Sequence, residues 1–155
     1  MYYFNWTADL NLGIKVIDSQ HKCVADYINL LQGAIELNDY ADAVYCADKL
    51  VEYTDELFVY EEALLKQSDY ELTEPHIAAH ERFKETAKKY QKAIQKSKDM
   101  MIVKQMCSEL TLWLTEHIKR EDTDFVDSVN RLYQKDSMFN GLFNFFTMNN
   151  KLVKA

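Results

Sequence analysis

The segment His76-Ile77-Ala78-Ala79-His80 places two histidines four residues apart. In an α-helix four residues turn through about 400°, so the two side chains lie only about 40° apart on one face. That face continues at helical spacing with Phe83, Ala87, Tyr90 and Ile94. Both imidazoles are therefore predicted to lie on the buried face of a helix, where polar rings need hydrogen-bonding or metal partners.

Three other segments show the same pattern, an apolar stripe at helical spacing that carries one titratable residue. A carboxylate on such a stripe must be paired or bound to a metal, because an isolated buried charge is very costly. Together with the stripe that contains His76 and His80, these stripes carry all four histidines of the chain. The three segments run from about 17 to 35 with His21, from about 40 to 67 with Glu61, and from about 100 onward with His117.

Short breaks at Asn38-Asp39, 68–73 and 97–99 separate four helical segments, the third of which ends at about Lys96. Four long helices joined by short connections predict an all-α fold, an up-down-up-down antiparallel four-helix bundle. Asp18 or Ser19 is expected to cap the first helix. In such a bundle the four histidines and the inward glutamate all lie at the same end.

The length of 155 residues is that of one domain. We expect a single domain over 1–155, with an N-terminal arm at 1–13, the bundle at about 14–122 and a C-terminal extension at 123–155. Phe125, Val129 and Leu132 predict a short extra helix in the extension. The aromatic stretch 138–146 is expected to fold back onto the bundle, or to contact a partner protein or a second copy of the chain.

Charge and composition exclude several classes of protein. The formal net charge of −7 argues against nucleic acid or an anionic membrane as the main partner. No segment reaches the roughly 18 apolar residues of a membrane helix, and the first residues lack the basic region of a secretory signal. The three cysteines fall inside helical segments without a C-x-x-C pair, which predicts reduced thiols and a cytoplasmic location.

The buried polar residues belong to longer motifs that together cover the chain from Trp6 to Asp122. In this pattern the chain resembles the bacterial hemerythrins. The matching residues are Gly13-Ile14, Ile17-Asp18-Ser19-Gln20-His21, Phe58-Val59-Tyr60-Glu61-Glu62, His76-Ile77-Ala78-Ala79-His80 with Phe83, and Trp113-Leu114-Thr115-Glu116-His117-Ile118 with Asp122.

The resemblance implies a non-haem di-iron centre inside a four-helix bundle, with five histidines and two bridging carboxylates, that binds O2 reversibly. Periodicity alone would select Glu121 as the last carboxylate, because Asp122 lies about 140° from His117 on a regular helix. The family pattern selects Asp122, and Glu121 is the second choice. Carried over to this chain, one iron would be held by His76, His80 and His117, the second by His21, and the two would be bridged by Glu61 and Asp122.

The chain departs from the family at Leu57, where the pattern has a histidine that holds the second iron. Leucine cannot bind a metal, and no further histidine is available. Three arrangements follow: a second iron with a more open site, a mononuclear site, or a replacement oxygen from Asp55, Glu56 or Tyr60. Direct ligation by Glu56 or Tyr60 would require distortion, because each lies about 100° from the inward positions.

The leading functional hypothesis is a non-haem iron protein, not an enzyme, that binds O2 or a related diatomic for storage, delivery or sensing. One alternative is an iron enzyme that reacts with O2, peroxide or NO at an open second site. Another is a mono-iron or metal-poor bundle that acts as an interaction module. Candidates for an apolar O2 pocket are Phe58, Leu110, Trp113, Leu114 and Ile118.

Overall fold

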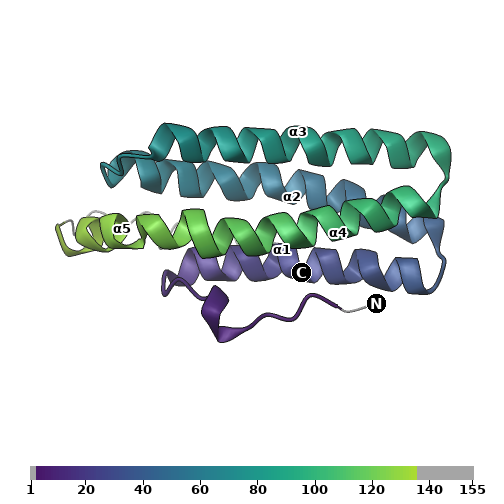
Figure 1. Ribbon diagram of the computed structural model, residues 1–155, viewed down its shortest axis with the longest axis horizontal. Helices are drawn as coiled ribbons and strands as arrows, with labels where there is room; N and C mark the ends of the chain where they lie inside the picture. Colours follow the sequence, from purple (N-terminus) through teal and green to yellow (C-terminus); the bar gives the residue numbers. More distant parts are fainter. Residues whose placement is uncertain (1–2, 136–155) are drawn as a thin grey trace.

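The computed structural model describes residues 3–135. Four long helices run alternately up and down along the molecule (Figure 1). A short helix follows the fourth at the end of the molecule where the first begins. The long helices are α1 (Lys15–Glu36), α2 (Tyr40–Gln67), α3 (Thr73–Ser97) and α4 (Met100–His117), and the short one is α5 (Thr123–Lys135).

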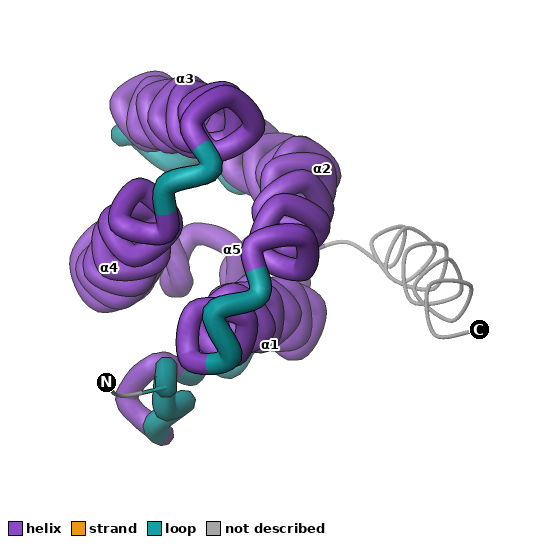
Figure 2. The backbone as a smooth tube through the Cα atoms, turned by 90° about the vertical axis from the view of Figure 1, so that its right-hand side faces the viewer, coloured by secondary structure: helices purple, strands orange, loops and turns teal. Residues whose placement is uncertain are grey.

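The four long helices enclose one central core. Viewed along their axes, α1 lies beside α2 and α4, while α3 lies between α2 and α4 on the opposite side (Figure 2). The predicted all-α antiparallel four-helix bundle is therefore confirmed, and so is the short C-terminal helix.

Within residues 3–135, no helix combines the length and the apolar character needed to cross a membrane. The aromatic stretch 138–146 lies outside the described residues.

Capping hydrogen bonds and backbone conformation at the connections determine where the helices start and end. The Asp39 side chain accepts a hydrogen bond of 3.0 Å from the backbone N–H of Asp42 at the start of α2. Asp99 does the same for Met101 at the start of α4, at 2.8 Å. Such caps satisfy backbone donors that have no partner within the helix. At the end of α3, Lys98 takes a left-handed conformation with φ 50°, which stops the helix.

The start of α1 differs from the sequence-based expectation. The helix begins at Lys15, so Asp18 and Ser19 lie within its first turns, and the expectation that one of them caps it was wrong. The buried Asp18 carboxylate instead accepts hydrogen bonds from the backbone N–H groups of Leu12 and Gly13, at 2.7 and 3.0 Å. It thereby fixes the chain just before the helix.

The N-terminal arm packs along the bundle. It contains the short helix η1 (Ala8–Leu10), and Leu10 is buried in the core. The backbone N–H of Phe4 donates a hydrogen bond of 2.7 Å to the Asn29 side chain on α1. Phe4, Trp6 and Leu12 are partly buried against the same core.

All three cysteines lie in the described part of the chain, and no disulfide joins them.

The buried apolar side chains form two clusters. The larger one fills most of the bundle and contains Leu50 and Met106. The smaller one lies where α1 begins, α2 ends and α5 packs, and it contains Ile17, Leu64 and Phe125. Burial of such side chains supplies the main stabilisation of the fold. In the sequence, the predicted polar site residues lie between residues of the larger cluster and residues of the smaller one.

We predict that Asp18→Ala lowers the free energy of unfolding by about 1–3 kcal/mol, because two buried N–H groups would lose a charged acceptor. Urea denaturation followed by circular dichroism measures this change. Asp26→Ala is the matched control, since Asp26 is an exposed aspartate on the same helix. Equal effects of the two substitutions would contradict the structural role of Asp18.

Candidate metal centre

Six polar residues converge in one layer of the bundle, at the end closed by α5. They come from all four long helices and from η2 (Ile118–Asp122), the turn that joins α4 to α5. Each side chain is almost fully buried, with exposures of 0–3%. The convergence predicted for one end of the bundle is therefore observed. The residues are His21, Glu61, His76, His80, His117 and Asp122.

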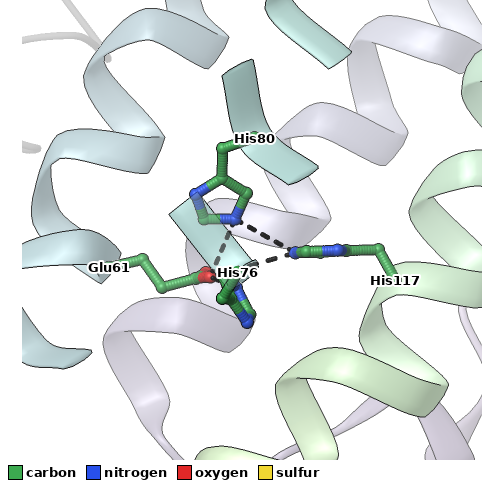
Figure 3. A group of neighbouring side chains, drawn as sticks. All are labelled: Glu61, His76, His80 and His117. Carbon is green, nitrogen blue, oxygen red and sulfur yellow. Dashed lines mark hydrogen bonds and ion pairs between the residues drawn. The ribbon is translucent and has the colours of Figure 1, made fainter. Parts of the chain in front are cut away.

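Three histidines and one carboxylate form the larger part of the layer (Figure 3). The Nε2 atoms of His76 and His80 lie 2.8 and 3.1 Å from Glu61 Oε1. The Nε2 atom of His117 lies 3.1 Å from that of His80. One nitrogen of each ring and the Glu61 oxygen all lie within 4.8 Å of one another, so this group could hold a metal ion.

A second group is built around His21. Its Nε2 atom lies 3.5 Å from Glu61 Oε2 and 3.4 Å from Asp122 Oδ2. The other oxygen of Asp122, Oδ1, lies 3.0 Å from His117 Nε2 and 3.3 Å from His76 Nε2. Each carboxylate therefore directs one oxygen to the three-histidine group and the other to His21. His21, Glu61 and Asp122 form a second group that could hold a metal ion.

The backbone after α4 decides which acidic residue faces the site. Residues Ile118–Asp122 form a π-helical turn, whose hydrogen bonds span five residues instead of four. This wider turn brings Asp122 to the same face as His117, five residues earlier. Glu121 points outward and is 46% exposed, yet its Oε2 lies 3.0 Å from His117 Nδ1. Sequence periodicity favoured Glu121, and the π-helical turn explains why Asp122 faces inward.

Two carboxylates contact the outer nitrogens of the histidine rings. Nδ1 of His80 donates a hydrogen bond of 3.1 Å to Glu62 Oε1. Glu121 lies beside Nδ1 of His117 at ion-pair distance, without the geometry of a hydrogen bond. With Nδ1 as the donor, Nε2 is left to bind in the interior. The sequence analysis gave Glu62 no role. The spacing of four residues between His117 and Glu121 was the available signal for the second contact.

Aromatic rings cover two of the histidines. Phe58 stacks on His80 with ring centroids 3.9 Å apart, and Trp113 stacks on His117 at 4.2 Å. Phe58 is fully buried, whereas Trp113 is half-buried. These are two of the five residues proposed from sequence as an O2 pocket. The other three, Leu110, Leu114 and Ile118, are buried in the larger apolar cluster.

Leu57 is 2% exposed and belongs to the larger apolar cluster, one turn before the buried glutamate on α2. The three alternative oxygen donors lie elsewhere. Asp55 pairs with Lys88 at 3.2 Å, and Glu56 is exposed. Tyr60 packs in the smaller apolar cluster. Among the described residues, neither the Asp55 nor the Glu56 carboxylate joins either group that could hold a metal.

The charges of this layer are not balanced by hydrogen bonds alone. Glu61 Oε2, both Asp122 oxygens and His21 Nδ1 are buried without a hydrogen-bond partner among residues 3–135. Burial opposes charge on His117, but Asp122 and Glu121 raise its pKa to about 10. Burial likewise opposes ionisation of Glu61, yet the three neighbouring histidines lower its pKa. Imidazole and carboxylate donors around one layer fit a divalent iron ion.

Comparison with known proteins agrees with this geometry. A sequence profile described as "Hemerythrin HHE cation binding domain" matches residues 12–128. The chain belongs to the hemerythrin family. Family membership implies a non-haem iron site, and the buried histidines and carboxylates are the residue types that such a site needs.

Several bacteriohemerythrins are similar in sequence. That of Pseudomonas paraeruginosa is 34% identical over 129 residues, 83% of each chain. That of Stenotrophomonas maltophilia is 32% identical over 124 residues, 80% of each chain. That of Clostridium acetobutylicum is 26% identical over 80% of this chain and 99% of its own. A crystal structure of a hemerythrin variant has the same fold, with a TM-score of 0.72, 20% identity, and coverage of 83% of this chain and 98% of that one.

The metal-free hemerythrin fold should lose stability at alkaline pH. His117 has an ordinary pKa of 6.5 in the unfolded chain and a pKa of about 10 in the fold. Its ion pairs therefore stabilise the protein fully below pH 6.5, and this stabilisation is lost as the pH rises to about 10. Urea denaturation of chelator-treated protein between about pH 6 and pH 10 measures this loss.

His117→Gln is the control for this prediction, because glutamine keeps a polar side chain that does not titrate. The variant should lose less stability over the same pH interval than the unsubstituted protein. Part of the slope should remain, since neighbouring carboxylates also raise the pKa of His80. An identical slope in both proteins would show that His117 carries no such charge.

Proposed function

We propose that the chain binds non-haem iron in this layer and uses it to bind O2 or a related diatomic, for storage, delivery or sensing. The main support for the proposal is that the two oxygens of each carboxylate face different groups of histidines. Glu61 and Asp122 each direct one oxygen to the three-histidine group and one to His21. This is the arrangement expected of carboxylates shared between two metal ions. The name bacteriohemerythrin of the similar proteins supports the same function.

The residues fall into two sets of donors. His76, His80 and His117 would hold the first iron, together with one oxygen each from Glu61 and Asp122. His21 would hold the second, together with the remaining two oxygens. When bound, divalent iron supplies electrons that can be shared reversibly with O2.

The chain would protect and orient the bound diatomic. The six polar side chains are at most 3% exposed, so bulk water is kept from the centre. Phe58 and Trp113 add apolar faces beside two of the histidines. Glu62 is hydrogen-bonded to the outer nitrogen of His80 and so would fix its orientation, and Glu121 forms an ion pair with the outer nitrogen of His117. A dry, oriented site favours release of the diatomic unchanged over its reaction with protons.

Leu57 favours a second candidate function. Because it removes one ligand from the His21 position, a metal there would keep more positions open for small molecules. An iron ion with open positions can react with peroxide or NO as well as bind O2. Turnover of peroxide or NO by the iron-loaded protein, without reversible O2 binding, would favour an enzyme over a carrier or sensor.

Iron content and optical spectra test the leading proposal. We expect the purified protein to contain iron and to show an absorption change on exposure to air that reverses when O2 is removed. Glu61→Gln should lose most of the iron, because both positions share that carboxylate. Glu74→Gln is the matched control, since Glu74 is exposed at the start of α3.

Three results would contradict the proposal. A folded protein that takes up no iron from anaerobic ferrous solution would exclude the metal centre. An iron-loaded protein with no O2-dependent absorption change would exclude O2 binding and leave the metal centre intact. Unchanged iron content in Glu61→Gln would show that the metal is bound elsewhere.

A further inference from the structure

The two groups of donors differ in number and in kind. The first combines three imidazole nitrogens, from His76, His80 and His117, with two carboxylate oxygens. The second has one imidazole nitrogen, from His21, with two carboxylate oxygens. Five protein donors against three implies a difference in metal affinity, because each lost ligand must be replaced by water or by another small molecule.

Two of the three histidines of the first group have supporting contacts on their outer side. His80 lies between the stacked ring of Phe58 and the Glu62 carboxylate at Nδ1. His117 is stacked on Trp113, and Glu121 Oε2 lies 3.0 Å from its Nδ1 as an ion pair, without the geometry of a hydrogen bond. Such outer contacts orient metal-binding imidazoles and increase their affinity. The first position is therefore largely organised before a metal arrives.

His21 lacks this support. Its Nδ1 atom is buried and has no hydrogen-bond partner among the described residues. Its Nε2 atom lies 3.4 and 3.5 Å from the two shared carboxylates, farther than the 2.8 Å between His76 and Glu61. Nε2 faces the two carboxylates, but among residues 3–135 no hydrogen bond at Nδ1 supports the orientation of the ring. A metal at this position would therefore be held by an imidazole with less support than His80 has.

Leu57, one helical turn before Glu61 on α2, offers no donor atom to this layer. It is 2% exposed, among apolar side chains. One turn before it on α2, the Thr54 hydroxyl donates a hydrogen bond of 2.9 Å to its own helix, to the Val51 carbonyl. The buried groups that could hold a metal near this position are only His21 and the two shared carboxylates, among residues 3–135.

We propose that the two positions fill in order: the three-histidine position binds a divalent metal first and tightly, and the His21 position binds a second metal weakly and exchanges it. This inference rests on the proposed metal centre. Its consequence is that the chain exists in one-metal and two-metal forms whose ratio follows the concentration of free divalent iron. The diatomic chemistry of the second position would then depend on metal supply.

A cobalt titration tests the order of filling. Co²⁺ takes the same nitrogen and oxygen donors, and its visible absorption reports binding without a redox step. Metal-free full-length protein is titrated with Co²⁺, and equilibrium dialysis gives the number bound. We expect two steps, with dissociation constants at least about tenfold apart, the size of effect that loss of one supporting contact has on metal affinity.

Three variants assign the steps. His21→Gln should remove the weaker step and leave the tighter one. Leu57→His should bring the two dissociation constants at least about tenfold closer, by adding an imidazole to the second position. Leu57→Phe is the matched control, because it introduces a ring without a donor atom, and it should keep the gap. Circular dichroism confirms that each variant is folded before it is titrated.

The outcomes separate the inference from the proposed function. Two metals bound with equal affinity, or in one cooperative step, would overturn ordered filling while leaving the metal centre intact. Loss of the tighter step in His21→Gln would overturn the assignment of the positions. No cobalt bound at all would overturn both the inference and the metal centre on which it rests. Two separated steps that converge only in Leu57→His would support it.

Discussion

Two carboxylates and four imidazoles share one buried layer, and their charges have to be balanced there because solvent does not reach them. In the metal-free chain, protons on histidines such as His117 provide part of that balance. A divalent cation would replace those protons and also engage the orphaned oxygens of Glu61 and Asp122. The helices of this bundle therefore have to meet in one register, since a shift of any one of them would leave a buried charge without a partner.

The apolar clusters on either side keep this layer dry. The larger one excludes water along most of the bundle, and the smaller one closes the end where α5 packs. Phe125 belongs to the smaller cluster, and its ring also meets the His76 ring edge to face, with centroids 5.5 Å apart. Asp18 fixes the turn before α1, three residues ahead of His21. Stability and site geometry thus depend on the same contacts.

Helical periodicity predicted the four helices and the inward histidines, because burial repeats along a helix with a fixed period. The family pattern added Asp122, which periodicity alone would have replaced by Glu121. The difference arises from the π-helical turn, a local change of hydrogen bonding that no apolar stripe reports. The contact of Glu62 with His80 joins residues on two helices, 18 positions apart. Such contacts depend on the packing of one helix against another, which a single sequence does not specify.

The π-helical turn also makes the spacing of this segment as important as its composition. Because the π-helical turn already holds one residue more than an α-helical turn, inserting a further residue within 118–121 would rotate everything that follows by about 100° relative to α4. Asp122 would turn away from His21, and the apolar face of α5 that carries Phe125 and Val129 would turn away from the bundle with it. Relatives that keep both the acidic ligand and the closing helix should therefore tolerate many substitutions in this turn but no added residue.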